Sequence, residues 1–169
     1  MKKLILLFAV ALFSVGIVSA QVYTEDSKLV NIGIGFGGGY TTGKVGIPPI
    51  SASFEKGITE KISVGGIAGY AASKYELMGF KSEYSYILLG ARGSYHFYNT
   101  DKIDGYAGAM LGYNIVSAKV TGLGAAASSS GLAYSGFVGG RYFFSEKLAA
   151  FAEIGYGISV ITFGVSLKL

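Results

Sequence analysis

The chain has 169 residues, of which 51% are apolar and only 14% charged, and its formal net charge is +4. This length suits one domain, and so mild a charge does not favour nucleic-acid binding, which uses clustered Lys and Arg. The absence of cysteine excludes a disulfide framework and a lipoprotein anchor. With a single histidine as well, we expect no transition-metal site and no cofactor.

The first twenty residues have the pattern of a secretory signal peptide. Lys2 and Lys3 form a basic start, residues 4–17 are almost wholly apolar, and Ala20 ends a run of small residues. The apolar run is shorter than the roughly 20 residues that a membrane-spanning helix needs. We therefore predict cleavage between Ala20 and Gln21, which leaves residues 21–28 as a short polar lead-in on the periplasmic side.

The rest of the chain is hydrophobic without any apolar run long enough for a membrane helix. Apolar residues instead alternate with small or polar ones, as in Val30, Ile32 and Ile34 against Asn31 and Gly33, which is the period of a β-strand. Eight such segments are predicted, at residues 29–40, 47–55, 62–73, 82–98, 103–116, 132–144, 148–157 and 160–169. Since a closed barrel satisfies every backbone group in lipid, we predict an all-β, eight-stranded antiparallel up-and-down transmembrane β-barrel over residues 29–169.

The connections between these strands alternate in length. Three tight turns carry an acidic residue and a lysine, at residues 60–62, 101–103 and 146–148, and the opposite connections include 41–46, 78–81 and 120–131. The last of these is rich in Gly, Ala and Ser and is predicted to be the longest, least structured loop. Short turns of such barrels face the periplasm, so both mature termini should lie there. Pro48 and Pro49 should mark a strand start or a bulge.

The charged residues predicted to face inward are few and specific. Arg92 and Arg141 are the only arginines, and both have inward parity, as has Glu153. An arginine facing lipid at mid-membrane would cost about 2–4 kcal/mol, so we predict an interior Arg92–Glu153–Arg141 network with Glu55 or His96 as further members. This network is interpreted as a structural plug, because an eight-stranded barrel is filled by its own side chains. The functional alternative is a charged constriction or a proton path.

Aromatic residues gather at the strand ends, where membrane barrels place interfacial girdles. The set near the longer loops is Tyr40, Tyr70, Tyr113, Tyr134 and Tyr156, and the set near the tight turns is Phe54, Tyr95, Phe97, Tyr142 and Phe144.

Two patterns superficially suggest chemistry. Ser94 and His96 share a strand face and could form a nucleophile–base pair, but His96 lies inward, near a periplasmic turn and far from outer-leaflet lipid. Gly33, Gly35 and Gly37 lie inside a strand with no helix after them, so they do not form a nucleotide-binding loop. We predict no catalytic residues.

The final strand also resembles a known signal. Thr162, Gly164, Leu167 and Leu169 fill the polar-x-Gly-x-x-apolar-x-apolar pattern that ends bacterial outer-membrane barrels, although Leu169 stands where an aromatic residue is usual. Together with the signal peptide, residues 48–50, the two Gly-x-Arg segments and residues 151–157, it makes the mature chain resemble the small outer-membrane β-barrels. That family includes the outer-membrane protein A and X barrels and the porin-like barrels of the Bacteroidetes type.

The resemblance implies a location rather than one activity. It implies an integral protein of the cell outer membrane, in contact with its lipid and inserted by the barrel-assembly machinery; it identifies no ligand or protein partner at the outer loops. We expect a non-enzymatic structural or interaction role. The alternatives are a narrow small-solute or ion channel, a lipid-modifying enzyme that uses His96, and, at the level of fold, a soluble ligand-binding eight-stranded barrel.

Overall fold

The computed structural model describes residues 21–37, 44–77, 80–121 and 126–169. The predicted signal peptide, with Ala20 at its cleavage site, and Tyr40 of the predicted girdle therefore lie outside the described residues. Within the described part of the chain, no helix is long and apolar enough to cross a membrane.

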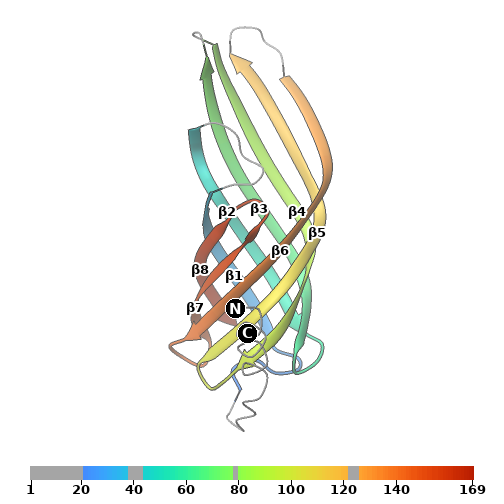
Figure 1. The fold of residues 1–169 in the computed structure, drawn as a ribbon, viewed down its shortest axis with the longest axis vertical. Coiled ribbons are helices and arrows are strands. Elements are labelled where there is room, and N and C mark those ends of the chain that lie inside the picture. The colour runs from blue at the N-terminus through green and yellow to red at the C-terminus, as the bar shows by residue number, and fades with distance from the viewer. Residues whose placement is uncertain (1–20, 38–43, 78–79, 122–125) are drawn as a thin grey trace, which may run out of the picture.

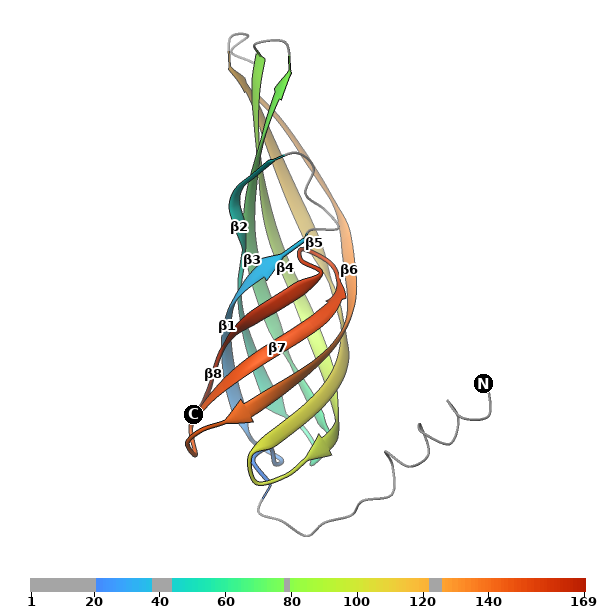
Figure 2. The same cartoon turned by 60° about the vertical axis from the view of Figure 1, so that its left-hand side comes forward.

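The described residues form a closed barrel of eight antiparallel strands, in which each strand pairs with the next and β1 pairs with β8 (Figures 1 and 2). This confirms the predicted architecture. The strands are β1 Lys28–Phe36, β2 Lys44–Gly57, β3 Ile62–Leu77, β4 Phe80–Asn99, β5 Ile103–Thr121, β6 Ala126–Phe143, β7 Leu148–Tyr156 and β8 Ile161–Lys168.

The barrel is apolar outside and polar inside. Along β1, Ile32 on the outer face is 64% exposed, whereas the neighbouring Asn31 is 3% exposed inside the lumen. The same alternation brings Glu55, Arg92 and Arg141 inside. A soluble barrel has the opposite arrangement, with its apolar side chains buried, so the soluble ligand-binding alternative does not fit this structure.

Most of the predicted girdle residues have outward exposed side chains. Those exposed near the longer connections are Tyr113, Tyr134 and Tyr156, and those near the tight turns are Phe54, Tyr95, Phe97, Tyr142 and Phe144; Tyr70 is half-buried.

Strands β3 to β6 are longer than predicted and rise as a four-stranded extension past β1, β7 and β8 (Figures 1 and 2). The prediction of a loop over residues 120–131 is wrong for much of its length, because residues 126–131 belong to β6 and pair with residues 114–119 of β5. Ala and Ser have modest strand propensity on their own, but a neighbouring strand can supply the ladder that local sequence does not indicate. β1 is shorter than predicted and ends at Phe36, before Gly37 at φ +64°.

The two prolines lie at an irregular part of β2. Its register with β3 shifts between Val45 and Ile47 and again between Ile47 and Ile50, the interval that holds Pro48 and Pro49. This confirms the predicted bulge and leaves the prolines outside the regular ladder.

Candidate functional site

The tight-turn half of the lumen holds a buried ionic network with Glu55 at its centre. Its Oε1 accepts hydrogen bonds from Arg141 at 2.6 Å and Asn31 at 2.9 Å, and its Oε2 accepts them from Ser94 at 2.7 Å and Ser63 at 3.0 Å. Glu55 is completely buried. A buried carboxylate is stable only when paired and hydrogen-bonded, and here every donor comes from a different strand.

Arg141 pairs with Glu55 and with Asp104, whose Oδ2 lies 2.8 Å from Nη1. Arg92 pairs instead with Glu153 at 2.8 Å and lies 3.6 Å from Glu55. The predicted link between Arg141 and Glu153 is therefore wrong, and Glu55 connects the two arginines. The register explains this, because Arg141 faces Asp104 directly across β5 and β6, whereas Glu153 is paired with Gly139.

Aromatic rings complete the environment of the arginines. The Arg92 guanidinium lies 4.2 Å from the centroid of the Phe137 ring, and that of Arg141 lies 4.0 Å from the centroid of the Tyr106 ring. Tyr106 also donates a hydrogen bond of 2.8 Å to Glu153. Such cation–π contacts add about 2 kcal/mol when desolvated, so both guanidinium groups are held on their faces as well as at their edges.

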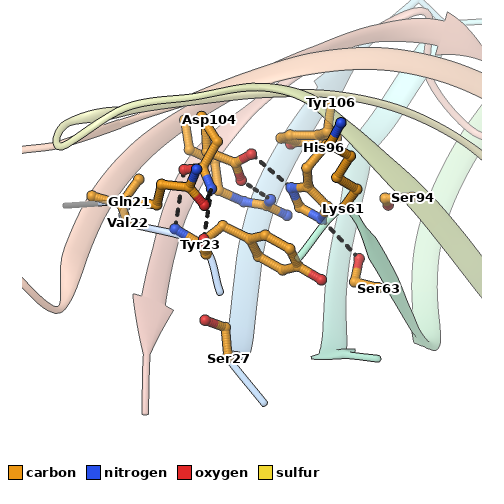
Figure 3. Close-up of polar contacts among 12 residues, drawn as sticks. Gln21, Val22, Tyr23, Ser27, Lys61, Ser63, Ser94, His96, Asp104 and Tyr106 are labelled. Carbon is orange, nitrogen blue, oxygen red and sulfur yellow. Dashed lines mark hydrogen bonds and ion pairs between the residues drawn. The ribbon is translucent and has the colours of Figure 1, made fainter. Parts of the chain in front are cut away.

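His96 extends the network toward the tight turns. Its Nδ1 lies 2.6 Å from Asp104 Oδ1, and its Nε2 lies 3.0 Å from the Ser63 hydroxyl (Figure 3). Ser94, which the sequence only superficially suggested as a partner of His96, donates a hydrogen bond to Glu55.

Ser63, His96 and Asp104 thus have the distances of a nucleophile, base and orienting acid. Other features oppose hydrolysis: Ser63 is fully buried and its oxygen also contacts the Glu55 carboxylate, which would repel a developing oxyanion. The chemistry favours a structural hydrogen-bond network.

The lead-in closes the lumen from the tight-turn side. The Tyr23 ring stacks on the His96 ring (Figure 3), with centroids 3.5 Å apart. The Tyr23 hydroxyl donates a hydrogen bond of 2.7 Å to the carbonyl of Ile62. Asn99 accepts from the Tyr23 amide and donates to its carbonyl, and Lys168 donates to the carbonyl of Val22. The lead-in therefore joins β3, β4 and β8 across the mouth of the barrel.

The environment of Tyr23 keeps its phenol neutral. Burial is the main cause, and the carboxylates of Asp104 and Glu55 add to it; together they raise the pKa of Tyr23 to about 12. The phenol therefore remains a hydrogen-bond donor over the physiological pH range.

A small cavity lies beside the network, between Arg92 and the β7–β8 connection. Its volume is about 50 Å³, and Arg92, Phe137, Glu153 and Ile158 are among its lining residues. That is room for a few water molecules. Arg92 Nε is buried with no hydrogen-bond partner among the described residues, so a water here would have a donor to satisfy.

Asp104, Tyr106, Ser63 and Tyr23 are absent from the sequence-predicted set. Asp104 and Tyr106 share the parity of Gly108 and Gly112, which the alternation also places inward, so strand parity could have found them. Tyr23 lies outside every strand and carries no such signal. Among the described residues, no group of three or more His, Cys, Asp or Glu could hold a metal ion.

The predicted assembly signal forms the seam of the barrel. β8 pairs with β1 from Leu29–Lys168 to Phe36–Ile161. Thr162 and Gly164 lie on the inner face, and Leu167 and Leu169 are exposed on the outer side. Leu169 donates from its amide to the carbonyl of Lys28, so the described ends of the chain lie together at the tight-turn end.

Comparison with known proteins identifies the fold. No protein-family model and no curated protein sequence matches this chain. Among solved structures, it is similar to the N-terminal β-barrel domain of OprF from Pseudomonas aeruginosa, with a TM-score of 0.58, 15% identity, and coverage of 86% of this chain and 98% of that one.

Two further structures agree. Ail, the attachment invasion locus protein of Yersinia pestis, has a TM-score of 0.55, 14% identity, and coverage of 86% and 96% of the two chains. Neisserial surface protein A has a TM-score of 0.52, 16% identity, and coverage of 85% and 95%. At such low identity the likeness concerns the fold alone: this chain has the architecture of the small eight-stranded outer-membrane β-barrels.

Proposed function

We propose that the protein is an integral outer-membrane barrel with a structural or interaction role, that its lumen does not conduct, and that it has no catalytic activity. The observation that carries this proposal is the buried network, in which Arg141 bridges Glu55 of β2 and Asp104 of β5 across the lumen. Paired charges that bridge opposite walls support a closed lumen, and Tyr23 covers the network from the tight-turn side.

The outer face supports the membrane location. Apolar side chains such as Ile32, Leu111 and Ile154 are 59% to 64% exposed, and a band of this kind is stable in lipid but costly in water. We propose that the tight turns and the joined chain ends face the periplasm, and that the barrel-assembly machinery recognises Thr162, Gly164, Leu167 and Leu169. The fold shared with OprF, Ail and Neisserial surface protein A is consistent with this placement.

Planar-bilayer recording tests the closed lumen. We expect no stable conductance from the mature chain, and no conductance from a form lacking residues 21–27, because the ion pairs beneath the lead-in remain. Replacing Arg141 and Glu55 together by alanine in that shortened form should produce steps. Steps from the unaltered chain that a lumen blocker abolishes would instead establish the channel alternative.

A separate experiment tests the absence of catalysis. Ser63→Ala and His96→Ala should leave lipid A acylation unaltered when the variants are expressed in a Gram-negative host, and the mature chain should not react with a fluorophosphonate probe. Labelling that disappears in Ser63→Ala would show that the Ser63–His96–Asp104 set is a working nucleophile.

A further inference from the structure

Among the described residues, one side of the upper half of β6 has no partner strand. Residues 126–142 pair with β5, but pairing with β7 begins only at Gly136. Figures 1 and 2 show β6 rising past the upper end of β7. We call residues 127–133 the β6 edge; of these, 127–132 are exposed. Such an edge presents backbone donors and acceptors that can pair with another chain.

The upper end of the β6 edge, residues 127–129, lies above the apolar band, and the exposed Leu132 at its lower end lies at the border of that band. Outward-facing residues change from apolar to polar between the Ile115–Ser130 and Ser117–Ser128 rungs of β5 and β6. At the same level β3 and β4 carry an exposed ion pair, Lys74–Glu83 at 2.9 Å. Polar outer side chains show that lipid does not cover this part of the sheet.

The opposite edge of the extension is protected in the ways that proteins use to prevent edge pairing. The upper part of β2 contains Lys44, Pro48 and Pro49, and its register with β3 shifts twice. The β6 edge has none of these devices: its sequence Ala-Ser-Ser-Ser-Gly-Leu-Ala contains no charge and no proline, and its ladder with β5 is regular. Only the β2 edge therefore carries features that prevent pairing with another strand.

We infer that the β6 edge pairs antiparallel with the same edge of a second copy of this chain. A two-fold pair closes both open edges at once, whereas an added foreign strand leaves its own outer edge free. The uncharged segment creates no like-charge pair when it faces itself. Antiparallel pairing inverts one copy, so the two barrels lie at opposite ends of one continuous sheet and join two facing membranes.

The pairing would be individually weak. A single strand edge of seven residues buries less than the roughly 1,200 Å² of a standard stable interface, so many copies on each membrane must act together. This deepens the interaction role proposed above, and its test does not depend on conductance, so the two proposals can fail separately.

Cysteine scanning tests the pairing, because the chain has no cysteine of its own. Single cysteines at Ser128, Ser129, Ser130 and Gly131 are oxidised in the full mature chain, reconstituted at many copies per phospholipid vesicle. Each residue away from the two-fold centre separates the paired Cα atoms by about 6.8 Å more, and a disulfide bridges only about 4.4–6.8 Å. We expect cross-linked dimer to peak at one position, or at two adjacent ones, at least roughly tenfold above the others.

Ser117→Cys is the matched control, since Ser117 is paired with Ser128 but lies on an internal strand. Adding Ser128→Lys with Ser130→Lys to the peak variant should reduce cross-linking roughly tenfold, whereas adding Ser85→Lys should not; heat-modifiable gel mobility verifies that each variant is folded. Cross-linking no greater than that of Ser117→Cys overturns the inference. Equal cross-linking at all four positions also overturns it, because it would indicate parallel pairing within one membrane.

Discussion

Glu55→Gln is the most informative test of the ionic network. The amide keeps the shape of the side chain, and its oxygen can still accept from Arg141 and Asn31, while the Ser63 and Ser94 hydroxyls can turn to accept from the new amide group. What is lost is the charge that compensates Arg141 and, at 3.6 Å, Arg92. Removing one partner of a buried ion pair costs about 3–5 kcal/mol, and the retained hydrogen bonds favour the lower end, about 3 kcal/mol.

The assay is reversible urea unfolding from phospholipid vesicles, followed by circular dichroism and by tyrosine fluorescence, since the chain has no tryptophan. Glu83→Gln is the matched control, because Glu83 also pairs with a cation but its side chain is 53% exposed, and exposed ion pairs contribute little to stability. Equal free energies of unfolding for Glu55→Gln and Glu83→Gln would refute the view that Glu55 organises the lumen.

Three further changes test other parts of the barrel. Gly139→Ala should destabilise the barrel by about 1–3 kcal/mol, because the added methyl would lie 2.7 Å from Glu153 and 2.9 Å from Tyr106. Gly136→Ala is the control, since a methyl there has nothing within 4 Å. Urea unfolding compares the stabilities of the two variants. The pKa of Tyr23 is near 10 in an unfolded chain and about 12 when the lead-in is docked. The lead-in should therefore resist protease digestion below pH 10 and become sensitive between pH 10 and 12. Sensitivity that does not change with pH would contradict the docking. Leu167→Asp and deletion of Leu169 should leave periplasmic aggregates in membrane fractionation. Ser166→Ala, whose hydroxyl has no partner among described residues, should insert normally; normal insertion of both Leu variants would place the signal elsewhere.

The alternation of side chains along each strand was sufficient to predict the barrel and the residues that face its lumen. Period-two alternation distinguishes the two faces of a strand without knowledge of its neighbours, and for this reason Arg92, Arg141 and Glu153 were each expected inside, where the structure has them. Parity does not predict which inward residues meet. That depends on register, and the prediction of a loop over residues 120–131 gave no basis for deriving the β5–β6 register from the length of their connection.

Asp104 illustrates this limit. It faces Arg141 directly because of the β5–β6 register, while Glu55 and Arg92 approach each other across Gly65, which is paired with both. A Cβ at Gly65 would collide with the backbone of Phe54, so the glycine is required for that approach. The predicted Arg141–Glu153 pair followed chain proximity, whereas the structure pairs Arg141 with Glu55 of β2 and Asp104 of β5.

The two closures of the lumen differ in how they could open. The ionic network joins β2, β4, β5, β6 and β7 through side chains whose backbones lie in continuous ladders, so separating its charges means unfolding the barrel. The lead-in belongs to no strand; it is attached by the Tyr23–His96 ring stack, by apolar packing of Tyr23, by hydrogen bonds and by the Lys56–Asp26 ion pair. Local opening with a low free energy is expected of such a segment. Release of Tyr23 would therefore expose His96 and Ser63 at the tight-turn end of the barrel without opening a pore, so any function that depends on the lead-in would act at that end and not through transport.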